Sequence, residues 1–320
     1  MNLLVPIFWL IIGLLLLIKG GDWFVDGASG IARRFHLPEI LIGATVVSIG
    51  TTLPEVMVSA GAAVKGVGDI AYGNAIGSII CNTSLIAAIT IAIKPGPAAR
   101  KSMFVPVSFF FGASAIYCFS SYVLGTFSRT IGVILLSVFV IYMVTTVMRM
   151  KKTAASIETV QIEEQVGALT SEAELEAQSG EDHTVESKEA GTKDSLLKDI
   201  VLLVVGAIII AIGASLLNEN AQTIARECGV SEKVIGLTIV ALGTSLPELV
   251  TAITSLIKGH GSLSLGNIIG ANLFNLVLVS GVSVTLNPFD VPVSGYIAGI
   301  NSSLVLDIPV MLGVMLILTI

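Results

Sequence analysis

Charged residues are scarce in this sequence. Asp, Glu, Lys and Arg make up 12% of its 320 residues, whereas hydrophobic residues make up 54%. A soluble domain is about one quarter charged, so the composition excludes an ordinary soluble protein. The net charge of −6 gives no reason to expect a nucleic-acid partner.

Cysteine is also rare, and no cleavable leader is recognisable. Cys81, Cys118 and Cys228 are an odd number at wide spacing, which predicts neither a disulfide framework nor a zinc site. The first 20 residues lack a basic start and a small-residue cleavage site. We therefore expect them to belong to a retained first span and not to a signal peptide.

Long apolar runs, in contrast, are abundant, for example at 3–18 and 200–217. Runs of this length cross a bilayer as helices. The sequence therefore predicts an all-α polytopic membrane protein with the lipid bilayer as its surroundings. We expect nine spans, at residues 3–25, 38–64, 70–93, 103–123, 128–149, 199–219, 233–257, 262–286 and 303–320.

The expected spans fall into two groups, 1–150 with spans one to five and 199–320 with spans six to nine. Between them, 151–198 is polar, and 12 of the 23 acidic residues lie between 151 and 199. A segment that is acidic and poor in aromatic residues cannot bury a core of its own. We expect a mobile, soluble loop there, with at most a short helix.

Lysine and arginine are unevenly distributed between the two sides of the expected spans. Around the first five spans, eight flank one side, whereas Lys65 and Arg129 flank the other. Because cytoplasmic loops carry the excess of basic residues, we expect the N-terminus outside the cell (inner) membrane and 151–198 in the cytoplasm. The eight are Arg33, Arg34, Lys94, Arg100, Lys101, Arg149, Lys151 and Lys152.

The two halves of the chain contain the same repeat. A shift of 193 places 43–86 on 236–279, with 17 identities in 44 positions. The repeats begin five spans apart, an odd number, so the second is predicted to enter the membrane upside down. Inverted repeats with interrupted helices are typical of secondary transporters, whose site lies at mid-membrane where the repeats meet.

Each repeat carries one acid inside an apolar span, Glu55 in "GTTLPEV" and Glu248 in "GTSLPEL". A carboxylate at that depth is costly unless it is paired or hydrated, and no lysine or arginine lies deep enough to pair with both. Two buried carboxylates also repel each other. A divalent cation would remove both problems, and Ca²⁺ prefers carboxylate, carbonyl and hydroxyl oxygens.

The neighbouring residues supply such oxygens. Thr51 lies four residues before Glu55, on the same helical face, and Thr244 stands in the same relation to Glu248. Proline frees backbone carbonyls one turn earlier because it lacks an amide hydrogen. Further hydroxyl and amide groups that can complete a polar ring are Thr52, Ser245, Ser78, Asn82 and Asn275.

At these residues the chain resembles the cation/calcium exchanger superfamily and, within it, the prokaryotic sodium/calcium exchangers with two α-repeats. The resemblance implies two inverted halves of about five helices each. It implies exchange of cytosolic calcium for external sodium, with sliding of the first and sixth helices over a core of helices two, three, seven and eight. No enzymatic activity and no cofactor are expected, and the chain would act as a monomer or a homodimer.

The resemblance also implies the ligands. Calcium would be bound by Glu55, Glu248, Thr51 and Thr244. Sodium would share these four residues. Further sodium ligands would be Thr52, Ser245, Ser78 and the carbonyl oxygens of Ser48 and Ala241. The central position would be occupied by Asn82 and Asn275.

Two features depart from the family pattern. Ala271 stands where Ser78 stands in the first repeat, so one sodium position lacks a hydroxyl. The chain also stops at Ile320, within or just after the ninth span, so the tenth helix of the family is expected to be missing.

Other functions stay open at this point. Proton-coupled calcium antiport would use the two glutamates as proton carriers, and a channel would use them as a selectivity ring. Potassium dependence is disfavoured because the family usually places an aspartate where this chain has Asn275. An intramembrane hydrolase would need a nucleophile with a base, and no histidine is expected in mid-span.

Overall fold

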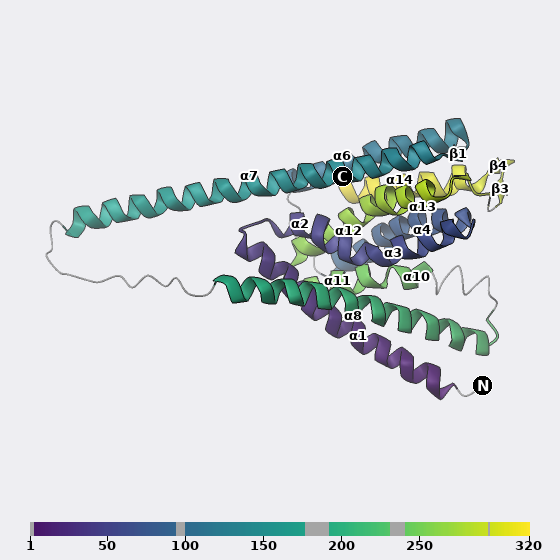
Figure 1. The fold of residues 1–320 in the computed structure, drawn as a ribbon, viewed down its shortest axis with the longest axis horizontal. Coiled ribbons are helices and arrows are strands. Elements are labelled where there is room, and N and C mark those ends of the chain that lie inside the picture. Colours follow the sequence, from purple (N-terminus) through teal and green to yellow (C-terminus); the bar gives the residue numbers. More distant parts are fainter. Residues whose placement is uncertain (1–2, 94–99, 177–191, 231–240, 294) are drawn as a thin grey trace.

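The computed structural model describes residues 3–93, 100–176, 192–230, 241–293 and 295–320 (Figure 1). Nearly all of them are helical, and π-helical turns (η) interrupt several of the helices. The first half contains α1 (Leu4–Arg34), α2 (Glu39–Ile42), η1 (Gly43–Val47), α3 (Ser48–Val64), α4 (Gly68–Cys81), η2 (Asn82–Ile86), α5 (Ala87–Ile93), α6 (Arg100–Cys118), η3 (Phe119–Leu124), β1 (Thr126–Phe127) and α7 (Arg129–Glu176). The second half contains α8 (Thr192–Glu227), α10 (Ala241–Thr244), α11 (Leu246–Ile257), α12 (Gly261–Phe274), η5 (Asn275–Val279), α13 (Ser280–Leu286), β2 (Phe289–Asp290), β3 (Tyr296–Ile297), β4 (Ile300–Asn301), η6 (Ser303–Asp307) and α14 (Ile308–Thr319).

The helices confirm the predicted fold class. Among the described residues, seven helical segments are long and apolar enough to cross a membrane, and two shorter apolar helices, Leu246–Ile257 and Ser303–Thr319, lie at the seventh and ninth predicted spans. The beginning of the span predicted at 233–257 falls outside the described residues. The short strands form two small antiparallel pairs, β1 with β2 and β3 with β4.

The segment after the fifth span differs from the expected loop. Helix α7 does not end near residue 149 but continues to Glu176, and α8 begins at Thr192, seven residues before its predicted start. The polar sequence beyond the membrane is rich in Ala, Glu, Gln and Lys, which are strong helix formers. A long extension of α7 therefore replaces the short helix that the acidic composition predicted; 177–191 lies outside the described residues.

Helices α1 and α8, the first of each half, run antiparallel along one side of the molecule (Figure 1). A Cβ atom added at Gly13 would lie 2.8 Å from the backbone of Leu217, and one at Gly27 would lie 2.5 Å from the backbone of Asp199. Early residues of α1 thus contact late residues of α8. Small residues allow this close approach. The opposite directions of the two helices agree with an inverted pair of halves.

The internal repeat is visible in the backbone itself. Helices α4 and α12 are both 14 residues long, and they begin 193 residues apart, as do the π turns η2 and η5 that follow them. The turns before them also match, because Gly66 and Gly259 both have positive φ angles, of 75° and 84°. The shift of 193 found in the sequence therefore describes the same local structure twice.

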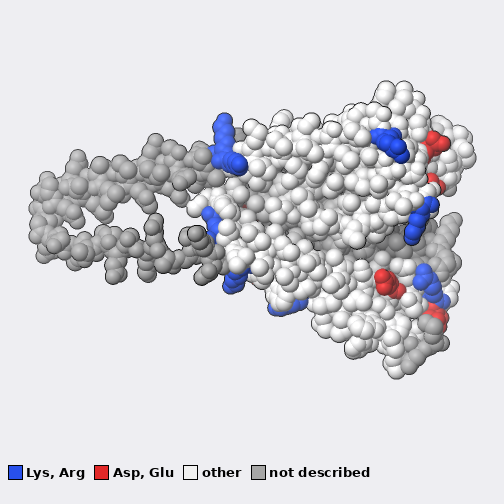
Figure 2. Space-filling model, in the orientation of Figure 1, with Lys and Arg blue, Asp and Glu red and all other residues white. Residues whose placement is uncertain are grey.

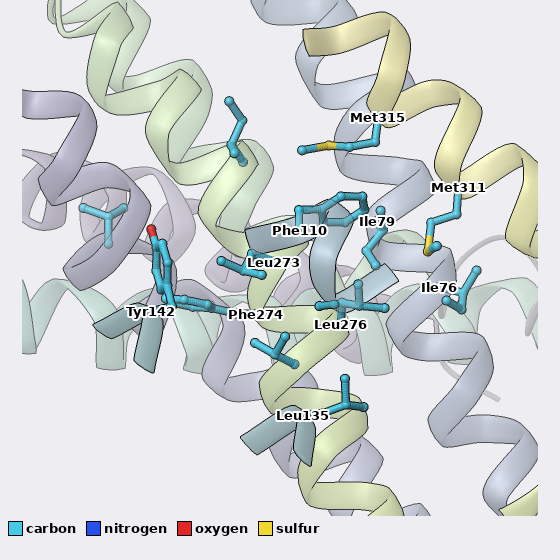
Figure 3. Close-up of a cluster of buried hydrophobic side chains, with 14 of the residues drawn as sticks. Ile76, Ile79, Phe110, Leu135, Tyr142, Leu273, Phe274, Leu276, Met311 and Met315 are labelled. Carbon is cyan, nitrogen blue, oxygen red and sulfur yellow. The ribbon is translucent and has the colours of Figure 1, made fainter. Parts of the chain in front are cut away.

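The buried core surrounds α12 and η5 (Figure 3). Side chains from α4, α6, α7 and α14 converge on it, and Tyr142 of α7 packs edge-to-face on Phe274. The Tyr142 hydroxyl donates to the carbonyl oxygen of Ala44 at 2.8 Å. Because Ala44 lies in η1, this bond ties α7 to the π turn that precedes α3.

Charged side chains gather at the two ends of the molecule, with an uncharged band between them on the face drawn in Figure 2. Lys and Arg appear at the end near the C-terminus of α1, whereas side chains of both charges appear at the opposite end. An uncharged band is what lipid contact requires.

Candidate functional site

Helix α3 carries one half of the candidate site. Ser48, Thr51, Thr52 and Glu55 are at most 1% exposed. Their spacing of three, four and seven residues from Ser48 places them along one face of the helix. The side of α3 that points into the protein is thus polar in a segment that is otherwise apolar.

The second repeat presents the corresponding residues on α10 and α11. Ser245 and Glu248 are 2% and 0% exposed, and Thr244 is half-buried. Ala241, whose carbonyl oxygen was predicted as a sodium ligand, is the first residue of α10.

The helix interruption predicted from the prolines is present in the second repeat and not in the first. Ser245 has φ −91° and ψ 7°, so it separates α10 from α11, and Pro247 lies in the first turn of α11. In the first repeat α3 continues through Pro54, and the irregular backbone lies one turn earlier, in η1. Proline at the start of a helix leaves no hydrogen bond unmade, whereas inside a helix it removes one.

The two predicted asparagines occupy equivalent places. Asn82 is the first residue of η2 and Asn275 the first residue of η5, and both are 0% exposed. Ser78 and Ala271 lie four residues earlier and are equally buried, at 2% and 0%. Widened π turns are frequent at functional sites because they disturb the regular backbone hydrogen bonds.

These elements come together in the middle of the bundle. Helix α3 contacts α4 and η5, and α10 contacts α4. Glu55 and Glu248, from opposite repeats, are close enough to interact with each other, and Thr51 lies beside Glu248.

The centre is rich in polar atoms without partners. Both carboxylate oxygens of Glu55 and of Glu248 are buried and make no hydrogen bond of good geometry with any described residue. The same holds for the side-chain polar atoms of Thr52, Ser78, Asn82, Ser245 and Asn275. Buried polar atoms of this kind are normally satisfied. Carboxylate, hydroxyl and amide oxygens that converge without partners fit a hard cation such as Ca²⁺ or Na⁺.

The structure adds neighbours that the sequence analysis did not select. Cys81 lies one residue before Asn82 and interacts with Ser245 and Glu248. Asn267 of α12 contacts the hydroxyl groups of Ser48 and Thr51. The match of Asn267 with Asn74 in the repeat was a usable signal, but the repeat does not indicate which residues each asparagine contacts.

A helical membrane protein with two inverted halves and a buried, oxygen-lined centre at their junction belongs to the class of cation transporters. The sequence pattern of the sodium/calcium exchanger proteins matches residues 5–148 and 198–320. The chain belongs to this family of cation/calcium exchangers.

Relatives and solved structures agree with this assignment. An uncharacterized membrane protein of Methanocaldococcus jannaschii is 34% identical over 277 residues, which cover 86% of this chain and 80% of that protein. The sodium/calcium exchanger MaX1 of Methanosarcina acetivorans is 30% identical, and the match covers 97% of this chain and 89% of that protein. The structure of the sodium-calcium exchanger NCX_Mj soaked with Na⁺ and Ca²⁺ superimposes on this one with a TM-score of 0.73 at 30% identity. The match covers 98% of this chain and 90% of the NCX_Mj chain.

Proposed function

We propose that this protein is a sodium-driven calcium antiporter that works by alternating access. The observation that carries the proposal is the pair Glu55 and Glu248, one from each repeat, fully buried and with no basic side chain buried beside them among the described residues. Two unpaired carboxylates in a low-dielectric interior repel each other, and one Ca²⁺ balances both charges.

Calcium would be held by Glu55, Glu248, Thr51 and Thr244, which come in equal numbers from the two repeats. Sodium has half the charge and would occupy several positions around the same carboxylates. Its further oxygens would come from Thr52, Ser245, Ser78 and the carbonyls of Ser48 and Ala241, with Asn82 and Asn275 at the centre. Competition of the two ions for shared carboxylates is the physical basis of exchange, because each ion must leave before the other is bound.

The two repeats differ in a way that supports alternating access. Gly266 and Asn267 of α12 are buried, whereas the equivalent Gly73 and Asn74 of α4 are exposed and half-buried. In the predicted orientation α12 begins on the cytoplasmic side and α4 on the external side. Among the described residues the motif is therefore more covered at the end of α12 predicted to face the cytoplasm than at the end of α4 predicted to face outside, as expected of an outward-facing state; the counterpart of the segment that covers α12 falls in 231–240, outside the described residues.

An ion pair at the end predicted to face the cytoplasm supports the same interpretation. Lys258 lies 2.8 Å from Asp26 and 3.4 Å from Asp22, so α11 is attached to α1. The equivalent Lys65 is exposed and forms no ion pair with any described residue. A state that opens toward the cytoplasm would have to break the contacts of Lys258.

We expect the substitution Ala271→Ser to strengthen sodium binding. It restores the hydroxyl that Ser78 supplies in the other repeat, and a hydrogen-bonding or ligating group contributes about 1 kcal/mol, or roughly a fivefold change in affinity. The sodium concentration for half-maximal calcium exchange, measured in vesicles, should fall accordingly. Ser78→Ala is the matched control and should raise it; an unchanged sodium curve in both variants would remove these positions from the site.

The transport reaction is tested with purified protein in liposomes. Liposomes loaded with sodium are diluted into radioactive calcium with an outward sodium gradient, with equal sodium on both sides, with a potassium gradient, or with a pH gradient alone. Uptake that requires the sodium gradient supports the proposal. Uptake driven by the pH gradient would assign the protein to proton-coupled antiport, and uptake without any gradient but with a calcium-selective current would indicate a channel.

A further inference from the structure

Asn267 of α12 is fully buried and reaches across to α3 of the opposite repeat. Its amide oxygen accepts a hydrogen bond from the hydroxyl of Thr51 at 3.2 Å and lies 3.3 Å from the hydroxyl of Ser48. Its amide nitrogen has no hydrogen-bond partner among the described residues. Asn267 thus meets α3 as an acceptor only.

The hydroxyl of Thr51 has a single hydrogen. Besides the carboxylate of Glu248, which lies beside it, two acceptors are within reach, namely the amide oxygen of Asn267 and the carbonyl oxygen of Ser48 at 3.4 Å. If the hydrogen pointed to Ser48, it would occupy a carbonyl that the sodium site uses. When it points to Asn267, that carbonyl is free and the lone pairs of the Thr51 oxygen are available to a cation.

Close backbone packing keeps Asn267 in this place. A Cβ atom at Gly266 would lie 2.3 Å from the carbonyl oxygen of Ile40, and one at Gly270 would lie 2.3 Å from the Ser48 hydroxyl. The Ser48 hydroxyl has its own short bond, to the carbonyl oxygen of Gly43 at 2.8 Å. Thr51 is therefore left as the donor to Asn267.

The equivalent residue of the first repeat has a different role. Asn74 donates to the carbonyl oxygen of Glu55 at 3.2 Å and to the hydroxyl of Ser59 at 2.8 Å. Both acceptors belong to its own repeat, and neither is a side-chain ligand of the candidate site. Asn74 and Asn267 are therefore equivalent in the sequence repeat but have different roles.

We propose that Asn267 is a positioning residue of the cation site. It accepts the Thr51 hydrogen and so directs two oxygens, the Thr51 hydroxyl and the Ser48 carbonyl, toward calcium and sodium. This inference rests on the proposed function, because it assigns Thr51 and Ser48 to the ion site.

The test is a double-mutant cycle on calcium binding, measured by titration calorimetry on the purified full chain. Asn267→Leu should weaken binding by about threefold to tenfold, the effect of one hydrogen bond. In the Thr51→Val background the same substitution should change binding by less than about twofold, because the hydroxyl that it orients is gone. Asn74→Leu is the matched control, and its effect should be the same with and without Thr51→Val.

Thermal unfolding without calcium verifies that each variant is folded, and Asn267→Ala replaces Asn267→Leu in the cycle if the larger side chain unfolds the protein. An equal effect of the Asn267 substitution in both backgrounds would overturn the inference, since Asn267 would then act by packing alone. If the wild-type chain binds no calcium at all, the proposed function fails and the positioning role fails with it.

Discussion

Glu55→Gln and Glu248→Gln should each abolish calcium transport while the protein still folds and reaches the membrane. Each substitution keeps the shape of the side chain and removes one of the two charges that would balance Ca²⁺ in the proposed site. Removing one partner of a buried charge pair costs about 3–5 kcal/mol, or roughly a hundredfold to several thousandfold in affinity. Calcium uptake into sodium-loaded liposomes measures the loss.

The control for this pair is Asp290→Asn, which neutralises an acid exposed on β2. Uptake should stay near the wild-type rate in this variant. Binding of radioactive calcium to the detergent-purified variants separates lost affinity from lost movement. Sodium-dependent uptake retained in either glutamine variant would contradict the assignment of the carboxylates as ligands.

Gly266→Ala should displace α12 from α2 and weaken both stability and ion binding. The added Cβ would lie 2.3 Å from the carbonyl oxygen of Ile40, and backbone atoms cannot turn aside as a flexible side chain can. Overpacking of this kind costs about 1–3 kcal/mol, which exceeds the gain of up to about 1 kcal/mol from replacing glycine in a helix. The melting temperature and the calcium affinity of the purified protein should both fall.

The internal repeat supplies the matched control. Gly73 is the equivalent glycine of α4; it is exposed, and a Cβ there meets no described residue within 4 Å. Gly73→Ala should therefore leave the melting temperature unchanged or raise it slightly. A similar loss of stability in both variants would mean that the asymmetry of the two repeats is not maintained in solution.

Much of this architecture could be predicted from the sequence because it depends on local signals. Apolar runs mark the spans, and the shift of 193 recurs in the lengths of α4 and α12. The glutamates could be selected because an acid in an apolar span is costly. The interruption at Ser245 was also predictable, since proline favours the start of a helix.

The asymmetry of the repeats could not be predicted in this way. Asn74 and Asn267 occupy the same position of the same motif, yet only Asn267 crosses to the other repeat. That difference arises from packing between distant segments, which a local pattern does not encode. The long extension of α7 has another cause, because the helix propensity of its residues outweighs the acidic composition that predicts a loop.

The buried carboxylates also have an electrical consequence. Glu55 and Glu248 are the only charged side chains that are buried among the described residues, and together they carry two negative charges when both are ionised. One Ca²⁺ cancels them, and so do two sodium ions; each additional sodium ion adds one positive charge. Suppose that the proposed exchanger carries one sodium ion more than charge balance requires for each Ca²⁺. Every transport cycle then moves one unit charge across the membrane. The membrane voltage would contribute about 2.3 kcal/mol per 100 mV to the driving force.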